Sequence, residues 1–169
     1  MRNRIPQSIL LAAGLCLAGP VFAATMTYTP LSGNPSGTYR IDPQHTNVFF
    51  TIGHVGIGQF TGRFDKITGT YTFNAQNPAQ DKVDITIPAA SINTDFALRD
   101  QHLRSKEFFD VKRYPNITFV SSKYVPNGPK KGELYGNLTL HGVTKPVVFQ
   151  VQEIGAGNVP YLPKPWGGY

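Results

Sequence analysis

The chain has 169 residues, 16 basic and 10 acidic side chains, a formal net charge of +6 and a single cysteine, Cys16. The basic residues are scattered rather than gathered in a stripe, which argues against a nucleic-acid-binding protein. One cysteine excludes a disulfide framework within the chain and a zinc site built on several thiolates.

The first 23 residues have the pattern of a cleaved signal peptide. Arg2 and Arg4 give a positive start, and the apolar segment 8–19 is shorter than the ~20 residues that a membrane-spanning helix needs. The segment Val21–Ala23 then offers a cleavage site. Cleavage leaves a chain without cysteine, which favours a bacterial periplasm over the eukaryotic secretory pathway, where small domains are usually rich in disulfides. We therefore predict an exported, periplasmic protein.

Beyond residue 23 the chain alternates between turn-rich and strand-like segments. Prolines, glycines and hydroxyl residues predict a flexible lead-in over residues 24–37, and the tail 160–169 has a similar loop-like composition. Alternation of apolar and polar side chains is typical of β-strands that are buried on one face. This alternation predicts strands at 38–42, 46–54, 60–73, 82–89, 116–124, 133–140 and 143–154.

Two further features, a phase change and two sets of turn residues, divide the predicted strands. The alternation within 60–73 changes phase near Asp65, which predicts a bulge or hairpin around Gly62 and Gly69. Turn residues at 130–132 and 141–142 separate the last three strands. The strands are therefore expected to be short and to follow one another closely.

One segment, residues 94–106, predicts a short helix instead of a strand. It follows Asn93, includes Thr94 as a second capping-type residue and Asp95 in the expected first turn, and ends in basic residues. These are start and stop signals whose charges suit the helix dipole. The domain is therefore expected to be mainly β, with one inserted helix.

Regular short strands favour either a β-sandwich or a β-barrel. In a sandwich the inward side chains fill the core, whereas a barrel of about eight strands can also hold one small ligand. Alternation does not distinguish these two architectures. A membrane-spanning barrel is disfavoured, because its lumen would be polar and its strands longer.

Three long stretches, in the same order, resemble the YceI-like, polyisoprenoid-binding periplasmic proteins. They are YRIDPQHTNVFFTIGHVGIGQFTGRFDKITGTYTF at 39–73, INTDFALRDQHLRSKEFFDVKRYPNITFVSS at 92–122, and GNLTLHGVTKPV at 136–147. The resemblance runs from about residue 38 to residue 166, which is nearly all of the chain after the expected signal peptide.

This resemblance implies an all-β, lipocalin-like antiparallel barrel of about eight strands, with the helix near 94–106 closing one end. It also implies an apolar interior that holds a polyprenyl or similar lipid tail, and no enzymatic activity. Members of that family continue into two further strands after the Trp-Gly element. We therefore expect the lipid-binding domain, 38–169, to be C-terminally incomplete, either because the sequence is truncated or because the barrel is open along one edge.

Binding of a prenyl tail would depend on displaced water, at roughly 0.8 kcal/mol per buried CH₂, whereas an exposed ion pair with a head group adds only ~0–1 kcal/mol. The inward apolar side chains are therefore the first candidates for ligand binding, although plain core packing explains each of them equally well. With His54 on the same face of its strand, they are Val48, Phe50, Ile52, His54, Phe60, Phe64, Ile67, Phe73, Ile85, Ile87, Phe119, Leu138, Val147 and Phe149.

Polar candidates are fewer. Arg99 and His102 of the expected helix could meet a lipid head group at the mouth, although a solvated helix face is the simpler interpretation. The histidines occur singly, without zinc-ligand spacing, and no nucleophile elbow is present. We therefore predict no metal, no cofactor and no catalytic residue.

The prediction from sequence is a periplasmic carrier or sequestering protein for an isoprenoid or other long-chain lipid. Three alternatives stay open: a binding module for a fatty acid or fatty amide, a hydrolase or isomerase that acts on a lipid head group, and a solid β domain without a cavity. The sequence also leaves open a homodimer and a transient contact with a membrane surface.

Overall fold

The computed structural model describes residues 29–30, 35–158 and 166–168. The signal peptide expected at 1–23 lies outside these residues. The elements in chain order are β1 (Thr29–Pro30), β2 (Gly37–Arg40), β3 (Val48–His54), β4 (Gly58–Phe64), β5 (Thr68–Phe73), η1 (Pro78–Gln80), β6 (Lys82–Pro88), η2 (Ala89–Ser91), β7 (Ile92–Asn93), α1 (Ala97–Arg104), β8 (Asn116–Gly128), β9 (Lys131–Leu140), β10 (Val143–Gln152), β11 (Gly155–Asn158) and β12 (Trp166–Gly168).

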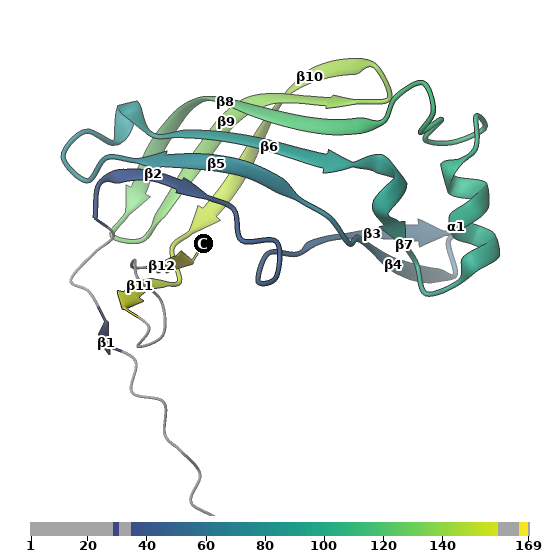
Figure 1. Ribbon diagram of the computed structural model, residues 1–169, viewed down its shortest axis with the longest axis horizontal. Coiled ribbons are helices and arrows are strands. Elements are labelled where there is room, and N and C mark those ends of the chain that lie inside the picture. The colour runs from purple at the N-terminus through teal and green to yellow at the C-terminus, as the bar shows by residue number, and fades with distance from the viewer. Residues whose placement is uncertain (1–28, 31–34, 159–165, 169) are drawn as a thin grey trace, which may run out of the picture.

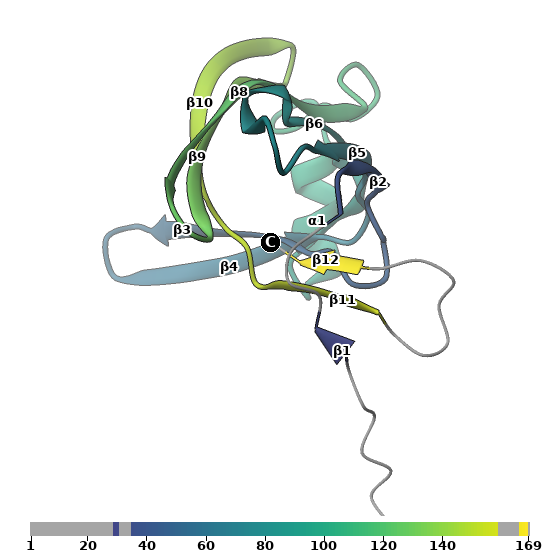
Figure 2. The ribbon, with the colours of Figure 1, turned by 90° about the vertical axis from the view of Figure 1, so that its left-hand side faces the viewer.

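The strands form three antiparallel sheets. The largest has six strands in the order β10-β9-β8-β6-β5-β2 and runs along the molecule (Figure 1). Seen from one end, it curves into an arc over the sheet β1-β11-β12 (Figure 2). The third sheet, β3-β4-β7, lies toward the other end, next to α1 (Figure 1).

The prediction of a mainly β domain with one short helix is confirmed, but a closed barrel is not observed in the described part of the chain. The six-stranded sheet ends at β2 on one side and β10 on the other. After β10 the chain enters β11, which pairs with β1 and β12 in a sheet of its own. The result is a curved, open sheet whose concave face is covered by the smaller sheets.

The predicted bulge or hairpin within 60–73 is wrong. Strand β4 pairs with β3 and β7, while β5 pairs with β2 and β6, so the chain passes from one sheet to another at Asp65. The Asp65 carboxylate accepts hydrogen bonds from Arg63 and Asn93, at 2.8 and 2.7 Å, and its backbone N–H donates to Ser91. Gly62 and Gly69 each lie inside a strand.

The helix is shorter than predicted, because the expected capping residues form other contacts. The N-cap is Phe96, which makes no side-chain capping bond. The backbone N–H and hydroxyl of Thr94 both donate to the buried Asp100, at 2.9 and 2.5 Å. Asp95 adopts a positive φ of 57° and accepts two hydrogen bonds from Arg63. The predicted start therefore forms a hydrogen-bonded loop that leads into α1.

Two segments expected to be loops contain short strands. Thr29 and Pro30, within the predicted flexible lead-in, pair with β11 as β1. Trp166–Gly168, within the predicted loop-like tail, pair with β11 as β12. The turn predicted at 141–142 is confirmed: His141 and Gly142 both have positive φ and close the β9–β10 hairpin.

The hydrophobic core lies at the end of the molecule that carries α1. Its buried members are Phe64, Ala89, Ile92 and Ile117. Partly buried side chains from β3, β6, β9, α1 and the loop after α1 pack against them: Val48, Phe50, Ile87, Leu103, Phe109, Val111 and Leu138. Aromatic rings fill much of this space, since Phe64 contacts Phe50 and Phe109 at centroid distances of 5.7 and 5.9 Å.

Substitution of the most enclosed core residue tests this description. Ile92 is 1% exposed, so Ile92→Ala should lower the free energy of unfolding by about 2–5 kcal/mol through lost burial and a residual cavity. The matched control is Ile57→Ala at the tip of the β3–β4 hairpin, where Ile57 is 87% exposed and the change should stay within about 0.5 kcal/mol. Equal losses for the two variants in urea unfolding would contradict this placement of the core.

Candidate ligand-binding cavity

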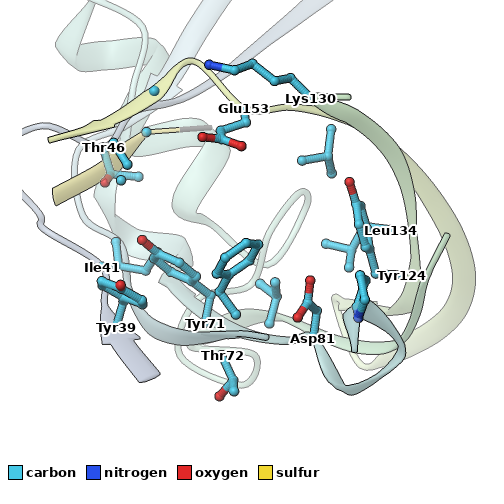
Figure 3. Close-up of a pocket in the computed structure, with 18 of the residues that line it drawn as sticks. Tyr39, Ile41, Thr46, Tyr71, Thr72, Asp81, Tyr124, Lys130, Leu134 and Glu153 are labelled. Carbon is cyan, nitrogen blue, oxygen red and sulfur yellow. The ribbon is translucent and has the colours of Figure 1, made fainter. Parts of the chain in front are cut away.

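A cavity of about 1170 Å³ lies under the concave face of the six-stranded sheet, at the end away from α1. Its walls come from β2, β5 and β6 on one side, from β8, β9 and the end of β10 on the other, and from β11 and β12 below. Figure 3 shows the labelled lining residues arranged around an open hollow. The site is therefore an open recess between two sheets.

Strand alternation points the lining side chains inward. Tyr71 and Phe73 of β5, Val83 of β6 and Leu134 of β9 lie on the concave face of the sheet. A register shift between Ser121 and Lys123 changes the phase of β8 and brings Tyr124 onto the same face. The Tyr124 ring lies over Gly132, where any Cβ would collide with the ring.

Small residues on the opposite wall keep this end hollow. The segments of β11 and β12 that line the cavity contribute Gly155, Ala156, Gly157, Gly167 and Gly168. These residues have at most one methyl group to fill the space below the sheet. At the α1 end, by contrast, phenylalanine rings fill the corresponding space. The cavity therefore follows from the sizes of the side chains that face the sheet.

Tyrosines form part of the inner wall. The rings of Tyr39 and Tyr71 are stacked, with centroids 4.9 Å apart and planes 8° from parallel. Burial, reinforced by the neighbouring Tyr39, raises the pKa of Tyr71 to about 12. The hydroxyl of Tyr39 donates to the backbone oxygen of Pro35, and burial raises its pKa too. Both phenols therefore stay protonated at neutral pH and present flat, largely apolar surfaces.

Acidic groups reach the cavity from two sides. Asp81 and Glu153 direct their carboxylates toward the hollow in Figure 3. Burial raises the pKa of Asp81, although the backbone N–H of Asn74, which donates to it at 2.7 Å, opposes the change. The pKa of Tyr124 is raised by burial and then by the charges of Asp81 and Glu153. Both carboxylates therefore act on the space in front of Tyr124.

A second charged group lies at the cavity rim. The side chain of His45 contacts the carboxylate of Asp42, and both residues line the cavity. The pKa of Asp42 is lowered, first by a hydrogen bond from the backbone N–H of Gln44 and then by the contact with His45. Arg40 and Lys130, the other basic lining residues, are exposed.

Of the sixteen candidates named from the sequence, Phe73 alone is among the lining residues. Val48, Phe50, Phe64, Ile87 and Leu138 belong to or pack against the core at the α1 end. For these five residues, the alternative of plain core packing matches their positions. Ile67 and Phe119 are also buried, and Ile85 and Val147 are half-buried, outside the cavity lining.

The other candidates lie near the β3–β4 hairpin, near α1 or on β10. Ile52 and His54 are exposed on the hairpin, and Phe149 is 45% exposed beside Phe119. The guanidinium of Arg99 stacks on Phe60, at 3.8 Å from the ring centroid. His102 is exposed and contacts Glu107 at 2.6 Å. Neither Arg99 nor His102 lines this cavity, so the structure does not bring them to its mouth.

Among the lining residues that the sequence reasoning missed, a few continue a face that it had identified, whereas many come from the segment between β2 and β3, from residues 126–130, and from β11 and β12. On β5 the face of Phe73 also includes Tyr71, and on β6 the face of Ile85 also includes Val83. Extending the same alternation along β9 from Leu138 reaches Leu134. Tyr124 could not be found this way, because the register shift in β8 changes the phase before it.

Other kinds of site are not evident in the described part of the chain. Residues 29–30, 35–158 and 166–168 contain no group of three or more His, Cys, Asp or Glu side chains placed to hold a metal ion. The same residues include no helix that is both long and apolar enough to span a membrane.

The pKa of Asp81 predicts a pH-dependent effect on stability. A raised pKa means that folding penalises the charged carboxylate, and this cost is present at neutral pH and disappears as the pH falls to its ordinary value of 3.8. Asp81→Asn keeps an acceptor for Asn74, so it should raise the Tm at neutral pH, with a gain that shrinks in acid. Calorimetry from neutral to acidic pH measures the Tm of both chains, and Asp84→Asn, which changes an exposed carboxylate on β6, is the control. A lower Tm of Asp81→Asn at neutral pH would contradict the account.

Comparison with known proteins identifies the family. The YceI-like domain matches residues 39–161. A UPF0312 protein of Photorhabdus laumondii is 42% identical over 139 residues, which cover 79% of this chain and 68% of that protein. A UPF0312 protein of Pseudomonas paraeruginosa is 40% identical over 171 residues, which cover 100% of this chain and 80% of that protein.

Solved structures agree with the mainly β fold. The YceI protein of Campylobacter jejuni is 36% identical with a TM-score of 0.56, over 70% of this chain and 69% of that one. BcnA of Burkholderia cenocepacia is 27% identical with a TM-score of 0.64, over 69% and 75% of the two chains. The expectation of missing C-terminal strands gains no support from these comparisons. The chain belongs to the YceI-like domain family.

Proposed function

We propose that this protein binds a long-chain isoprenoid lipid in the cavity between the six-stranded sheet and β11–β12, as a periplasmic carrier or sequestering protein. The observation that carries the proposal is the cavity itself, at about 1170 Å³. Sites for drug-sized ligands are roughly 300–1,000 Å³. The volume therefore suits a ligand longer than most metabolites.

The lining supports an apolar tail as the main part of this ligand. Phe49, Phe73, Val83, Leu134 and Val151 face the cavity from the sheets. Each CH₂ of a lipid tail that leaves water for such a surface contributes roughly 0.8 kcal/mol. A tail of several isoprene units can therefore supply most of the binding free energy, and the role needs no chemical step.

Different observations favour the isoprenoid ligand, the periplasmic location and the binding role. The isoprenoid is favoured by the resemblance to polyisoprenoid-binding proteins, and the periplasm by the signal-peptide pattern at 1–23. A binding role without enzymatic activity is favoured by the absence of a nucleophile elbow from the sequence. Fractionation of cells that express the full chain should place the processed protein in the periplasm.

The identity of the ligand can be tested on the purified protein. Organic extraction followed by mass spectrometry should release an isoprenoid lipid in an amount comparable to that of the protein. A fatty acid or fatty amide in the extract would reassign the cavity to another amphiphile. Empty extracts, together with no uptake of added prenyl lipid, would refute lipid binding.

A matched pair of variants tests the location. Val83→Trp places an indole in the cavity, whereas Val120→Trp adds the same ring to an exposed position on β8. Displacing about two buried methylenes at ~0.8 kcal/mol each should weaken prenyl-lipid binding by about tenfold in Val83→Trp. Val120→Trp should bind like the unmodified chain. Unchanged affinity in a folded Val83→Trp variant would exclude this cavity as the binding site.

A further inference from the structure

The acidic and basic residues that line the cavity differ in how far they are exposed. Asp81 and Glu153 are half-buried lining residues, and no ion pair joins either of them to a basic side chain among the residues that the structure describes. The basic lining residues Arg40 and Lys130 are exposed. His45 contacts another carboxylate, that of Asp42.

The exposure of each charged side chain determines how strongly it interacts electrostatically with a bound ligand. Water screens the charges of the exposed Arg40 and Lys130. The half-buried carboxylates of Asp81 and Glu153 are surrounded by a lower effective dielectric constant, so their charges act more strongly on a bound ligand. Burial is the main cause of the raised pKa of Tyr124, and the negative charges of Asp81 and Glu153 raise it further, which places both carboxylates close enough to act on the phenol. Their charges disfavour any further negative charge in front of Tyr124 and favour a positive one.

Apolar lining residues lie beside these carboxylates, where they would contact the tail of a bound lipid. Val83 lies two residues after Asp81, and Val151 two residues before Glu153, and all four residues line the cavity. A tail that packs on Val83, Leu134 and Val151 would place its polar end within reach of the carboxylates. A ligand of this kind is an amphiphile with an apolar chain and one charged end.

We propose that Asp81 and Glu153 make the cavity selective for lipids with a cationic, ammonium-type head group over lipids with a neutral or anionic one. This selectivity rests on the proposed lipid-binding function and adds the chemical class of the head group. The hydroxyl of Tyr124 lies in the same field and can accept a hydrogen bond from an ammonium. The tail supplies affinity, and the two carboxylates supply the choice of head group.

Three lipids with one tail separate the two contributions. Geranylgeranylamine, geranylgeraniol and geranylgeranyl phosphate are compared on the full chain at neutral pH, by displacement of a fluorescent prenyl probe. The amine should bind about tenfold more tightly than the alcohol, as expected for a partly buried charge-assisted contact, and the phosphate more weakly than the alcohol. Equal affinities, or tightest binding of the phosphate, would overturn the selectivity and leave lipid binding intact. Binding of none of the three would instead remove the proposed function.

Substitution of the two carboxylates tests whether they cause the selectivity for the amine. The double variant Asp81→Asn with Glu153→Gln should lose the preference for the amine, so that its amine and geranylgeraniol affinities become similar, and circular dichroism shows whether it is folded. Asp84→Asn is the matched control, because Asp84 is exposed and lies outside this cavity on the same strand as Val83. Retention of the full amine preference in the double variant would refute the assignment.

A measurement on the unmodified chain gives an independent check. The amine stays charged in acid, whereas the carboxylate of Asp81, whose pKa burial raises above its ordinary value of 3.8, takes up a proton as the pH is lowered. The ratio of amine affinity to alcohol affinity should therefore fall as the pH is lowered from ~7 to ~4. A ratio that does not change with pH would contradict a role for the carboxylates.

Discussion

The site depends on how the concave face of the six-stranded sheet is covered. A curved sheet exposes an apolar inner face that must pack against something or enclose a space. At one end Phe50, Phe64 and Phe109 pack under the sheet and form a solid core. At the other end the covering strands β11 and β12 present glycines and Ala156, so the inner face stays open. Core and cavity thus lie under opposite ends of the six-stranded sheet.

Much of the local structure could be predicted from the sequence. Side-chain alternation is a local property, and it identified β3, β6, β8, β9 and β10 and the inward face of β6. The pairing of strands is not local, so the division of 60–73 between two sheets was missed. The helix start was misplaced for a similar reason: Thr94 bonds to Asp100 and Asp95 to Arg63, contacts that cannot be inferred from capping preferences alone.

The cavity was harder to predict than the strands around it. The same alternation continues along both ends of each strand, so Leu138 in the core and Leu134 in the cavity have similar sequence patterns. What separates them is the size of the residues across from them, which belong to segments distant in the chain. Tyr71 and Asp81 were not among the binding residues expected from the sequence, although the polar groups of the lining carry the proposed selectivity.

The central claim is that a lipid tail lies at the end of the sheet away from α1. Intermolecular nuclear Overhauser effects between a bound, unlabelled prenyl lipid and methyl-labelled protein test it most directly. The account predicts contacts from the tail to the methyl groups of Val83, Leu134 and Val151. Contacts to Ile92 and Leu103 in the core, without contacts to the cavity methyl groups, would contradict it.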